Sequence, residues 1–258
     1  MSVLFQDIIF GPVHSRRLGV SLGVNLLPVE AKFCTFNCIY CECGWTHEKS
    51  LHDVRLPAME EVLGKLELKL KEMKESGAHP DAITFAGNGE PTIHPKFPEI
   101  LEEVIRLRDI YFPEAGVSVL SNASTLDRPA VFNALLKTGD SILKLDAGTE
   151  AMFRLINDPR TGITLKSIIE KLKAFKGRLI IQTLFLRGTI NGRRIDNTAE
   201  PEISRWLEHI RDIRPKYVMI YPIDRATPLE TLEKVPFSEL KMIADKVEKL
   251  GIKAQVYY

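Results

Sequence analysis

All the cysteines of the chain lie on one short stretch, Lys32–Trp45, which reads KFCTFNCIYCECGW. Cys34, Cys38, Cys41 and Cys43 fall there within ten consecutive residues of a 258-residue protein. The disulfides of secreted proteins close loops between distant residues, and four crowded thiols cannot do this. The stretch therefore predicts a metal site.

The spacing of the cysteines indicates which kind of metal site this is. A structural zinc site normally takes four ligands from two separated pairs, so that the metal joins distant segments. Cys34, Cys38 and Cys41 have the spacing C-x3-C-x2-C instead. Three thiolates on one loop can hold three corners of a [4Fe–4S] cluster and leave the fourth iron without a protein ligand. Cys43 follows Cys41 after one residue, which is awkward for another corner, so we expect that it is not a permanent ligand.

Strand-like and helix-like segments alternate along the chain that must position this loop. Apolar strand-like runs occur at 20–27, 82–86, 117–120, 142–146, 179–186 and 217–221, and a last strand lies at 253–258. Helical periodicity occurs near 57–75, 98–110, 128–137, 164–175, 199–213 and 237–250. Repeated βα units predict an α/β fold with a parallel sheet and helices outside it. Asn197 and Glu200 have the spacing of a capping box at the start of one helix.

Polar residues gather where the predicted strands end. The runs are followed by the cysteine loop, by GNGEPT (Gly87–Thr92), SNAST (Ser121–Thr125), Asp146-Ala147-Gly148, Arg187-Gly188 and YPIDR (Tyr221–Arg225). Such residues are ordinary turn formers. The carboxyl ends of parallel strands, however, meet at one edge of a sheet or barrel and form its working site. Six such ends in succession predict an active site there.

Composition limits the class of protein. The apolar content of 45% and the length suit one domain spanning residues 1–258. The 35 basic and 34 acidic residues nearly cancel, so the charge pattern of a general nucleic-acid binder is absent. The chain has no secretory leader pattern and no run of about 20 apolar residues. We expect a cytoplasmic protein that does not bind membranes.

Two motifs resemble those of the radical S-adenosylmethionine (SAM) superfamily. CTFNCIYC matches the C-x3-C-x-φ-C motif, with Tyr40 in the aromatic position. GNGEP resembles the glycine-rich motif that follows the second strand, although Asn88 separates Gly87 from Gly89 where the usual form has adjacent glycines. The stretches LKLDAGTEAMFRLINDP, IQTLFLRG and IYPIDRATPLETLEKVP are similar to a sparsely characterised branch near the wyosine-forming tRNA enzymes. The resemblance extends over nearly the whole chain.

The resemblance implies a fold, cofactors and a reaction. The fold would be a partial (β/α)6 TIM-like barrel of parallel strands with an additional C-terminal strand. The cofactors would be a [4Fe–4S] cluster and SAM, which the reduced cluster cleaves to methionine and a 5′-deoxyadenosyl radical that removes hydrogen from a substrate. An external one-electron donor such as flavodoxin or ferredoxin would be a partner. A tRNA substrate is compatible with the branch but is not indicated by the net charge.

The same resemblance implies roles for individual residues. Metal ligands would be Cys34, Cys38 and Cys41, and cofactor-binding residues would be Tyr40, Gly87, Gly89, Glu90, Ser121, Asn122, Asp146, Gln182 and Tyr221. Within this set, Tyr40 and Tyr221 would lie beside adenine, and the glycine-rich motif would border the methionyl end. Ser121 and Asn122 would meet the ribose or the carboxylate, unless they only cap a turn.

The substrate is the least determined part of the prediction. The segment Leu186–Thr198 is a long polar connection with Arg187, Arg193 and Arg194, and Arg225 follows the next strand. Charged loops are usually just solvated. Because the planar guanidinium suits carboxylates and phosphates, we expect an anionic or nucleotide-like substrate held by Arg187 and Arg225, which would be the catalytic candidates.

Two other classes of function remain open from the sequence. One is an activase that makes a glycyl radical on a protein partner, although LKLDAG departs from the aspartate-leucine-lysine pattern of such activases. The other is a non-enzymatic iron–sulfur or zinc-binding module, which would not need GNGEP or the polar strand ends. The substrate itself cannot be deduced from the sequence.

Overall fold

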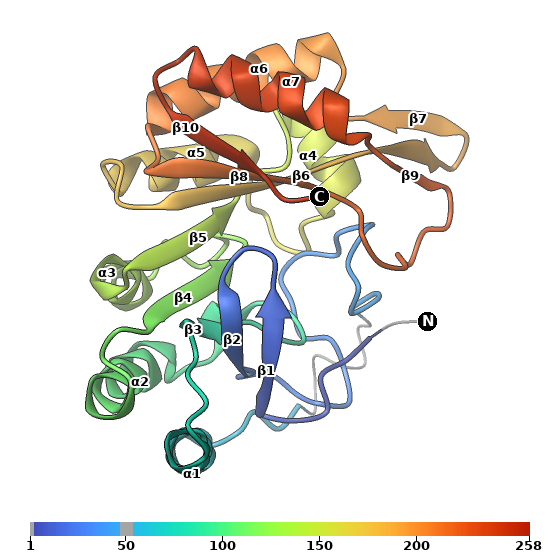
Figure 1. Ribbon diagram of the computed structural model, residues 1–258. Helices are drawn as coiled ribbons and strands as arrows, with labels where there is room; N and C mark the ends of the chain where they lie inside the picture. Colours follow the sequence, from blue (N-terminus) through green and yellow to red (C-terminus); the bar gives the residue numbers. More distant parts are fainter. Residues whose placement is uncertain (1–2, 47–53) are drawn as a thin grey trace.

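The computed structural model describes residues 3–46 and 54–258. Its centre is one curved sheet in the order β1-β2-β3-β4-β5-β6-β8-β10 (Figure 1). The strands are β1 (Ile9–Ser15), β2 (Gly19–Val24), β3 (Ala82–Phe85), β4 (Gly116–Ser121), β5 (Asp140–Lys144), β6 (Ile180–Ile190), β8 (Tyr217–Pro222) and β10 (Lys253–Val256). From β2 to β10 all neighbours are parallel, and β1 is antiparallel to β2. The predicted α/β class and the additional C-terminal strand are confirmed.

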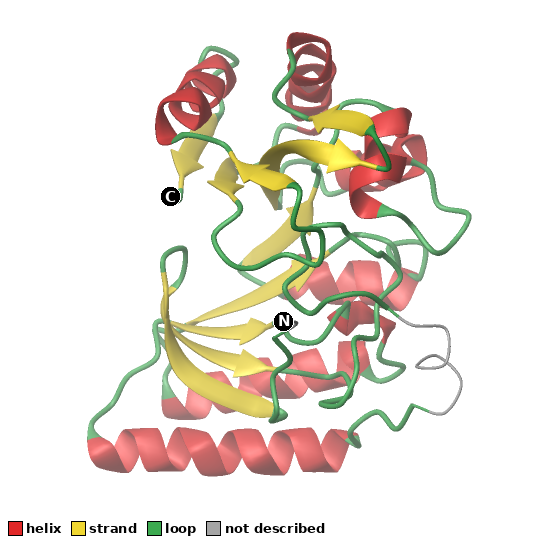
Figure 2. Cartoon of the chain, turned by 90° about the vertical axis from the view of Figure 1, so that its right-hand side faces the viewer, coloured by secondary structure: helices red, strands yellow, loops and turns green. Residues whose placement is uncertain are grey.

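Helices connect the parallel strands and lie on the outer side of the curved sheet, as Figures 1 and 2 show. They are α1 (Met59–Ser76), α2 (Phe97–Tyr111), α3 (Pro129–Lys137), α4 (Glu150–Asn157), α5 (Leu165–Ala174), α6 (Glu200–Ile213) and α7 (Phe237–Glu248), with a short 3-10 turn, η2 (Pro91–Ile93). Each long helix turns an apolar stripe to the sheet; α1, for example, buries Val62, Leu66, Leu70 and Met73. No helix in the described parts of the chain is long and apolar enough to cross a membrane.

The polar connection expected over Leu186–Thr198 is a β-hairpin, and that prediction was wrong. Strand β6 continues to Ile190 and pairs with β7 (Arg193–Asp196) on one side and β9 (Leu232–Lys234) on the other, both antiparallel. Asn191 and Gly192 make the turn with φ of 47° and 75°. Because a type I′ hairpin turn needs positive φ at both central positions, the Asn-Gly pair favours it. The polar and charged side chains at the end of β6 and in β7 obscured these strands in the sequence.

Two further details of the helices differ from expectation. Helix α4 was not predicted; it begins after Thr149, whose side chain accepts a hydrogen bond from the Met152 amide. The capping box at Asn197 is absent, since α6 begins after Ala199. The Asn197 side chain instead donates to the carbonyl oxygens of Asp146, at 2.9 Å, and Leu184, at 2.8 Å. It thereby ties β6 to the segment that follows β5.

Candidate cluster and cofactor site

The cysteine loop is joined directly to the glycine-rich loop. Phe33 and Gly89 form a parallel bridge, in which the Phe33 amide donates to Asn88 O at 2.8 Å and the Glu90 amide donates to Phe33 O at 3.2 Å. A Cβ atom on Gly89 would lie 1.9 Å from Phe33 O, and the φ of Gly89 is +141°. Only glycine permits this close approach. The first cysteine is therefore held beside the loop that the resemblance assigns to the methionyl end of SAM.

Asn88, the residue that interrupts the usual pair of glycines, has a structural function. Its side chain is buried and donates to Phe5 O at 2.9 Å and Pro28 O at 2.7 Å, while its Oδ1 accepts from the Phe5 amide at 2.8 Å. The Asn88 amide donates to Asn25 Oδ1 at 3.2 Å. All polar groups of this side chain are thus used to attach neighbouring segments, which explains the departure from the motif.

The sulfur atoms of three cysteines, Cys34, Cys38 and Cys43, form weak hydrogen bonds with nearby groups. Cys34 Sγ accepts from the Phe36 amide at 3.4 Å and from Asn122 Nδ2 at 3.6 Å. Cys38 Sγ accepts from Asn157 Nδ2 at 3.4 Å. N–H donors directed at sulfur stabilise thiolate ligands and tune an attached cluster. Cys43 differs, because its Sγ donates to Gly87 O at 3.6 Å.

The charges around the loop distinguish the thiols. Burial raises the pKa of the Cys34 thiol to about 12, although the nearby Lys32 ammonium acts in the opposite direction. A hydrogen bond from Cys43 lowers the pKa of Cys41 to about 5, with help from Lys32. Donating that bond raises the pKa of Cys43. The interaction between the two thiols therefore favours negative charge on Cys41 over negative charge on Cys43.

These residues fit a four-iron cluster. The thiols of Cys34, Cys38 and Cys41 all lie near one cation, Lys32. In the described residues no three His, Cys, Asp or Glu side chains are arranged around a single metal ion. A cluster does not require that arrangement, because each thiolate binds a different iron atom.

Glu90 fastens the glycine-rich loop to the end of β4. Its carboxylate accepts from Thr92 Oγ1 at 2.5 Å, Ser121 Oγ at 2.8 Å and the Asn122 amide at 2.6 Å. Glu90 is 1% exposed, and burial raises its pKa even though these donors favour the carboxylate. Asn122 also reaches Thr35 Oγ1, at 3.0 Å. Ser121 and Asn122 therefore lie beside the cysteine loop, and their hydrogen bonds to Glu90 also help to hold the glycine-rich loop.

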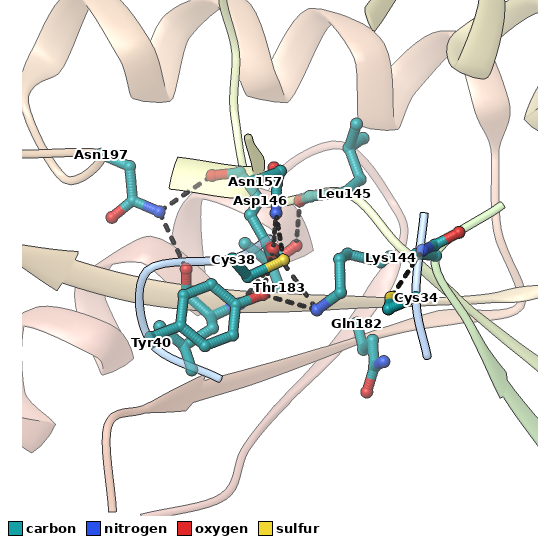
Figure 3. Close-up of polar contacts among 12 residues, drawn as sticks. Cys34, Cys38, Tyr40, Lys144, Leu145, Asp146, Asn157, Gln182, Thr183 and Asn197 are labelled. Carbon is teal, nitrogen blue, oxygen red and sulfur yellow. Dashed lines mark hydrogen bonds and ion pairs between the residues drawn. The ribbon is translucent and has the colours of Figure 1, made fainter. Parts of the chain in front are cut away.

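A second group of contacts surrounds Asp146 after β5 (Figure 3). The carboxylate accepts from Asn157 Nδ2 at 2.8 Å, from the Leu184 amide at 3.0 Å and from the Tyr40 hydroxyl. Lys144 Nζ lies 2.6 Å from Tyr40 Oη and 3.4 Å from Asp146 Oδ2. Burial alone would lower the pKa of Lys144, but the Asp146 carboxylate and other anionic groups raise it above its ordinary value. The aromatic residue of the cysteine motif is thus bound to β5.

The remaining cofactor candidates meet at the turn between β1 and β2. Arg17 Nη1 donates to Gln182 Oε1 at 3.0 Å, and its guanidinium lies over the Tyr221 ring, 4.8 Å from the centroid. In the described residues Arg17 forms no ion pair with a carboxylate. Arg16, beside it, pairs with Asp224 at 2.8 Å. These contacts place the turn against the carboxyl end of β8.

The two arginines expected to hold the substrate bind acidic residues of this chain. The Arg187 guanidinium contacts Glu239 of α7 and Asp196, the latter at 3.2 Å, and donates to Thr198 Oγ1 at 2.7 Å. Arg225 Nη1 donates to Glu42 Oε2 at 2.7 Å and its side chain is 60% exposed. They have separate partners, and only Arg225 contacts the cysteine loop.

Several residues of the site were missed in the sequence. Lys144 is the last residue of β5, and a lysine inside an apolar strand was a usable signal. Lys32 and Arg17 gave no comparable signal, since each lies in a turn or loop rich in polar residues. Asn157 could not be found because helix α4 was not expected.

Comparisons with known proteins establish the family. The profile described as "Radical SAM superfamily" matches residues 31–200, and the chain belongs to this superfamily. The UPF0026 protein MJ1312 of Methanocaldococcus jannaschii is 32% identical over 81% of this chain, which spans 61% of that protein's length. The predicted superfamily is confirmed.

Solved structures show the same fold. A radical SAM methyltransferase from Sphaerobacter thermophilus has a TM-score of 0.67 at 15% identity, over 92% of this chain and 66% of that one. Streptococcus suis SuiB bound to S-adenosylmethionine has a TM-score of 0.63 at 13% identity, over 91% of this chain and 50% of that one. Archaeal TYW1 has a TM-score of 0.51 at 14% identity, over 89% of this chain and 71% of that one. The partial TIM-like barrel is confirmed, and a [4Fe–4S] cluster and SAM are the cofactors of the superfamily to which the chain belongs.

Proposed function

We propose that the chain binds one [4Fe–4S] cluster through Cys34, Cys38 and Cys41 and uses it to cleave SAM. The observation that carries this is the bridge between Phe33 and Gly89, which holds the cysteine loop against the glycine-rich loop. When bound, the cluster and SAM supply one-electron reduction and a carbon-centred radical. The protein's own contribution is to position both groups and to exclude water.

The proposal gives each group of side chains a task. Glu90 fixes the loop that borders the methionyl end, through its bonds to Ser121 and Asn122. Tyr40, held by Asp146 and Lys144, and Tyr221, beneath Arg17, would flank the adenine. Gln182 would orient Arg17. A cytoplasmic location with a flavodoxin- or ferredoxin-like electron donor is part of the proposal, since a reducing compartment preserves free thiols.

The test of this function is anaerobic reconstitution with iron and sulfide, followed by a strong reductant and SAM. We expect slow formation of 5′-deoxyadenosine and methionine in equal amounts without substrate. A protein that holds a full cluster and forms neither product would disprove the proposal. Cys38→Ala is the matched control, because it removes one ligand and leaves the rest of the loop.

We propose that the substrate is anionic or nucleotide-like. The support is the cationic side chains near Tyr221 and the cysteine loop: Lys144, Arg225 and Arg17. Arg187 stays a candidate only if it exchanges Glu239 for the substrate. If the proposal holds, Arg225→Ala should keep substrate-free SAM cleavage and lose stimulation by substrate, by about tenfold or more for one charge-assisted bond. Stimulation equal to that of the wild type would exclude a role for Arg225.

The alternatives have weaker support. An activase would act on a protein partner, and a metal-binding module would need neither the buried Glu90 nor the Tyr40–Asp146–Lys144 contacts. Detection of 5′-deoxyadenosine separates the module from an enzyme, and a requirement for a protein substrate would separate the activase from an enzyme acting on a small anion. A tRNA substrate remains compatible with the proposal.

A further inference from the structure

Lys32 is a buried lysine inside the cysteine loop. It is 4% exposed and stands two residues before Cys34. Its Nζ donates to the Gly44 carbonyl oxygen at 2.8 Å, so that the side chain spans the loop from its first residues to its last. The ammonium also lies within hydrogen-bonding range of the Cys41 sulfur. The charge is therefore held at a fixed place among the thiols.

The charge of Lys32 has no carboxylate partner in the described residues, although the other buried lysine of the site, Lys144, has Asp146 at 3.4 Å. A buried ammonium is costly unless an opposite charge is near. The acidic groups that surround Lys32 are the thiols of Cys41, Cys34 and Cys38. The lysine and the ligand set are thus electrostatic counterparts.

We propose that Lys32 is a positioning residue whose positive charge raises the reduction potential of the cluster bound by Cys34, Cys38 and Cys41. The inference rests on the proposed function. Reduction adds one negative charge to the ligand set, and a nearby fixed cation stabilises the reduced form more than the oxidised form. Such outer contacts are a principal means by which a protein adjusts a metal centre. Without Lys32 the cluster becomes harder to reduce.

A merely structural role for Lys32 would rest on its bond to Gly44, and substitutions separate the two roles. Lys32→Met keeps the approximate length and removes both the charge and the donor. Lys32→Gln keeps an N–H donor without the charge. Lys32→Arg keeps the charge. Lys65→Met is the matched control, because Lys65 is exposed on α1 and forms an ion pair with Glu61 on the same helix.

The experiment is a redox titration of the anaerobically reconstituted protein without SAM, followed by the electron paramagnetic resonance signal of the reduced cluster. Omitting SAM removes any effect that acts through the cofactor. At the potential where half of the wild-type cluster is reduced, Lys32→Met and Lys32→Gln should show a ratio of reduced to oxidised cluster lower by about tenfold, from the loss of one nearby charge. Lys32→Arg and Lys65→Met should stay near the wild-type ratio.

Other results would decide against the inference. A ratio in Lys32→Met and Lys32→Gln equal to that of the wild type would show that the charge does not act on the cluster. Loss of iron from both neutral variants would show a role in cluster assembly instead, and would also overturn it. A wild-type protein without any reducible four-iron cluster would contradict the proposed function itself, so the two failures are distinguishable.

Discussion

The Nζ atom of Lys144 lies 2.6 Å from the phenolic oxygen of Tyr40. This contact joins the last strand residue of β5 to the aromatic residue of the cysteine motif. Asp146 accepts a hydrogen bond from the Tyr40 hydroxyl and forms an ion pair with Lys144 at 3.4 Å. Because all three side chains are largely buried, the position of the cysteine loop depends on a charged pair inside the barrel.

We expect Asp146→Asn to lower the free energy of unfolding by about 3–5 kcal/mol, because it leaves Lys144 buried without its carboxylate. Chemical denaturation of the purified protein measures this. The exposed pair of Glu61 and Lys65 is the control, and Glu61→Gln should cost less than about 1 kcal/mol. Similar losses of unfolding free energy for the two variants would contradict the expectation that the pair of Lys144 and Asp146 contributes more to stability than the exposed pair.

Gly89→Ala should separate the cysteine loop from the glycine-rich loop. The new Cβ would lie 1.9 Å from a backbone oxygen, that of Phe33, so the backbone itself must move. The expected result is loss of most of the iron after reconstitution, together with a lower melting temperature. Gly64→Ala is the matched control, since a Cβ there meets nothing within 4 Å and a helical alanine is favoured by about 0.5–1 kcal/mol. Normal iron content in Gly89→Ala would refute this prediction.

Substitution of the cysteines should give two outcomes. Cys34→Ala, Cys38→Ala and Cys41→Ala should each lose most of the iron, whereas Cys43→Ala should retain one four-iron cluster, because the Cys43 thiol donates to Gly87 O and its interaction with Cys41 raises its pKa. Iron and sulfide analysis, with the visible absorption of the cluster, measures this. An iron loss in Cys43→Ala as large as in the other three would show a fourth ligand and a closed electron-transfer site.

His94 should make the fold sensitive to mild acid. Burial lowers its pKa below the ordinary value of 6.5, and its ring nitrogens are used by the Pro57 carbonyl oxygen and the Lys96 amide. The unfolded chain therefore binds a proton more readily than the folded chain. Stability is fully present above about pH 6.5 and falls as the pH drops below it. His94→Gln should remove this part of the pH dependence in denaturation curves.

The sequence was sufficient for the parts of the fold that depend on local pattern. Apolar runs and helical periods placed the parallel strands and their helices, because burial on one face imposes those periods. The hairpin after β6 was missed because its strands are polar, and α4 was missed because it is short.

Residues of the site were predictable only where they belong to a sequence motif or follow a predicted strand. Tyr40 and Asp146 could be named from the sequence, but their mutual contact joins residues 106 positions apart. The ion pair between Arg187 and Glu239 likewise depends on how α7 packs, which no local pattern reports. The sequence shows Lys32 as a lysine in a loop. Its burial depends on how that loop folds.

The sheet has a seam between its first and last strands. Its hydrogen-bonded path ends at β1 and at β10. In the described residues the turn between β1 and β2 contacts other parts of the sheet through side chains: Arg16 pairs with Asp224, just after β8, and Arg17 donates to Gln182 of β6. Arg16 and Asp224 are 46% and 40% exposed, so their pairing contributes little. Parting the seam breaks no ladder of backbone hydrogen bonds. Closure of the barrel along this seam therefore depends on side-chain contacts, among them the packing of Leu18 against a buried apolar cluster that includes Met219 and Tyr257.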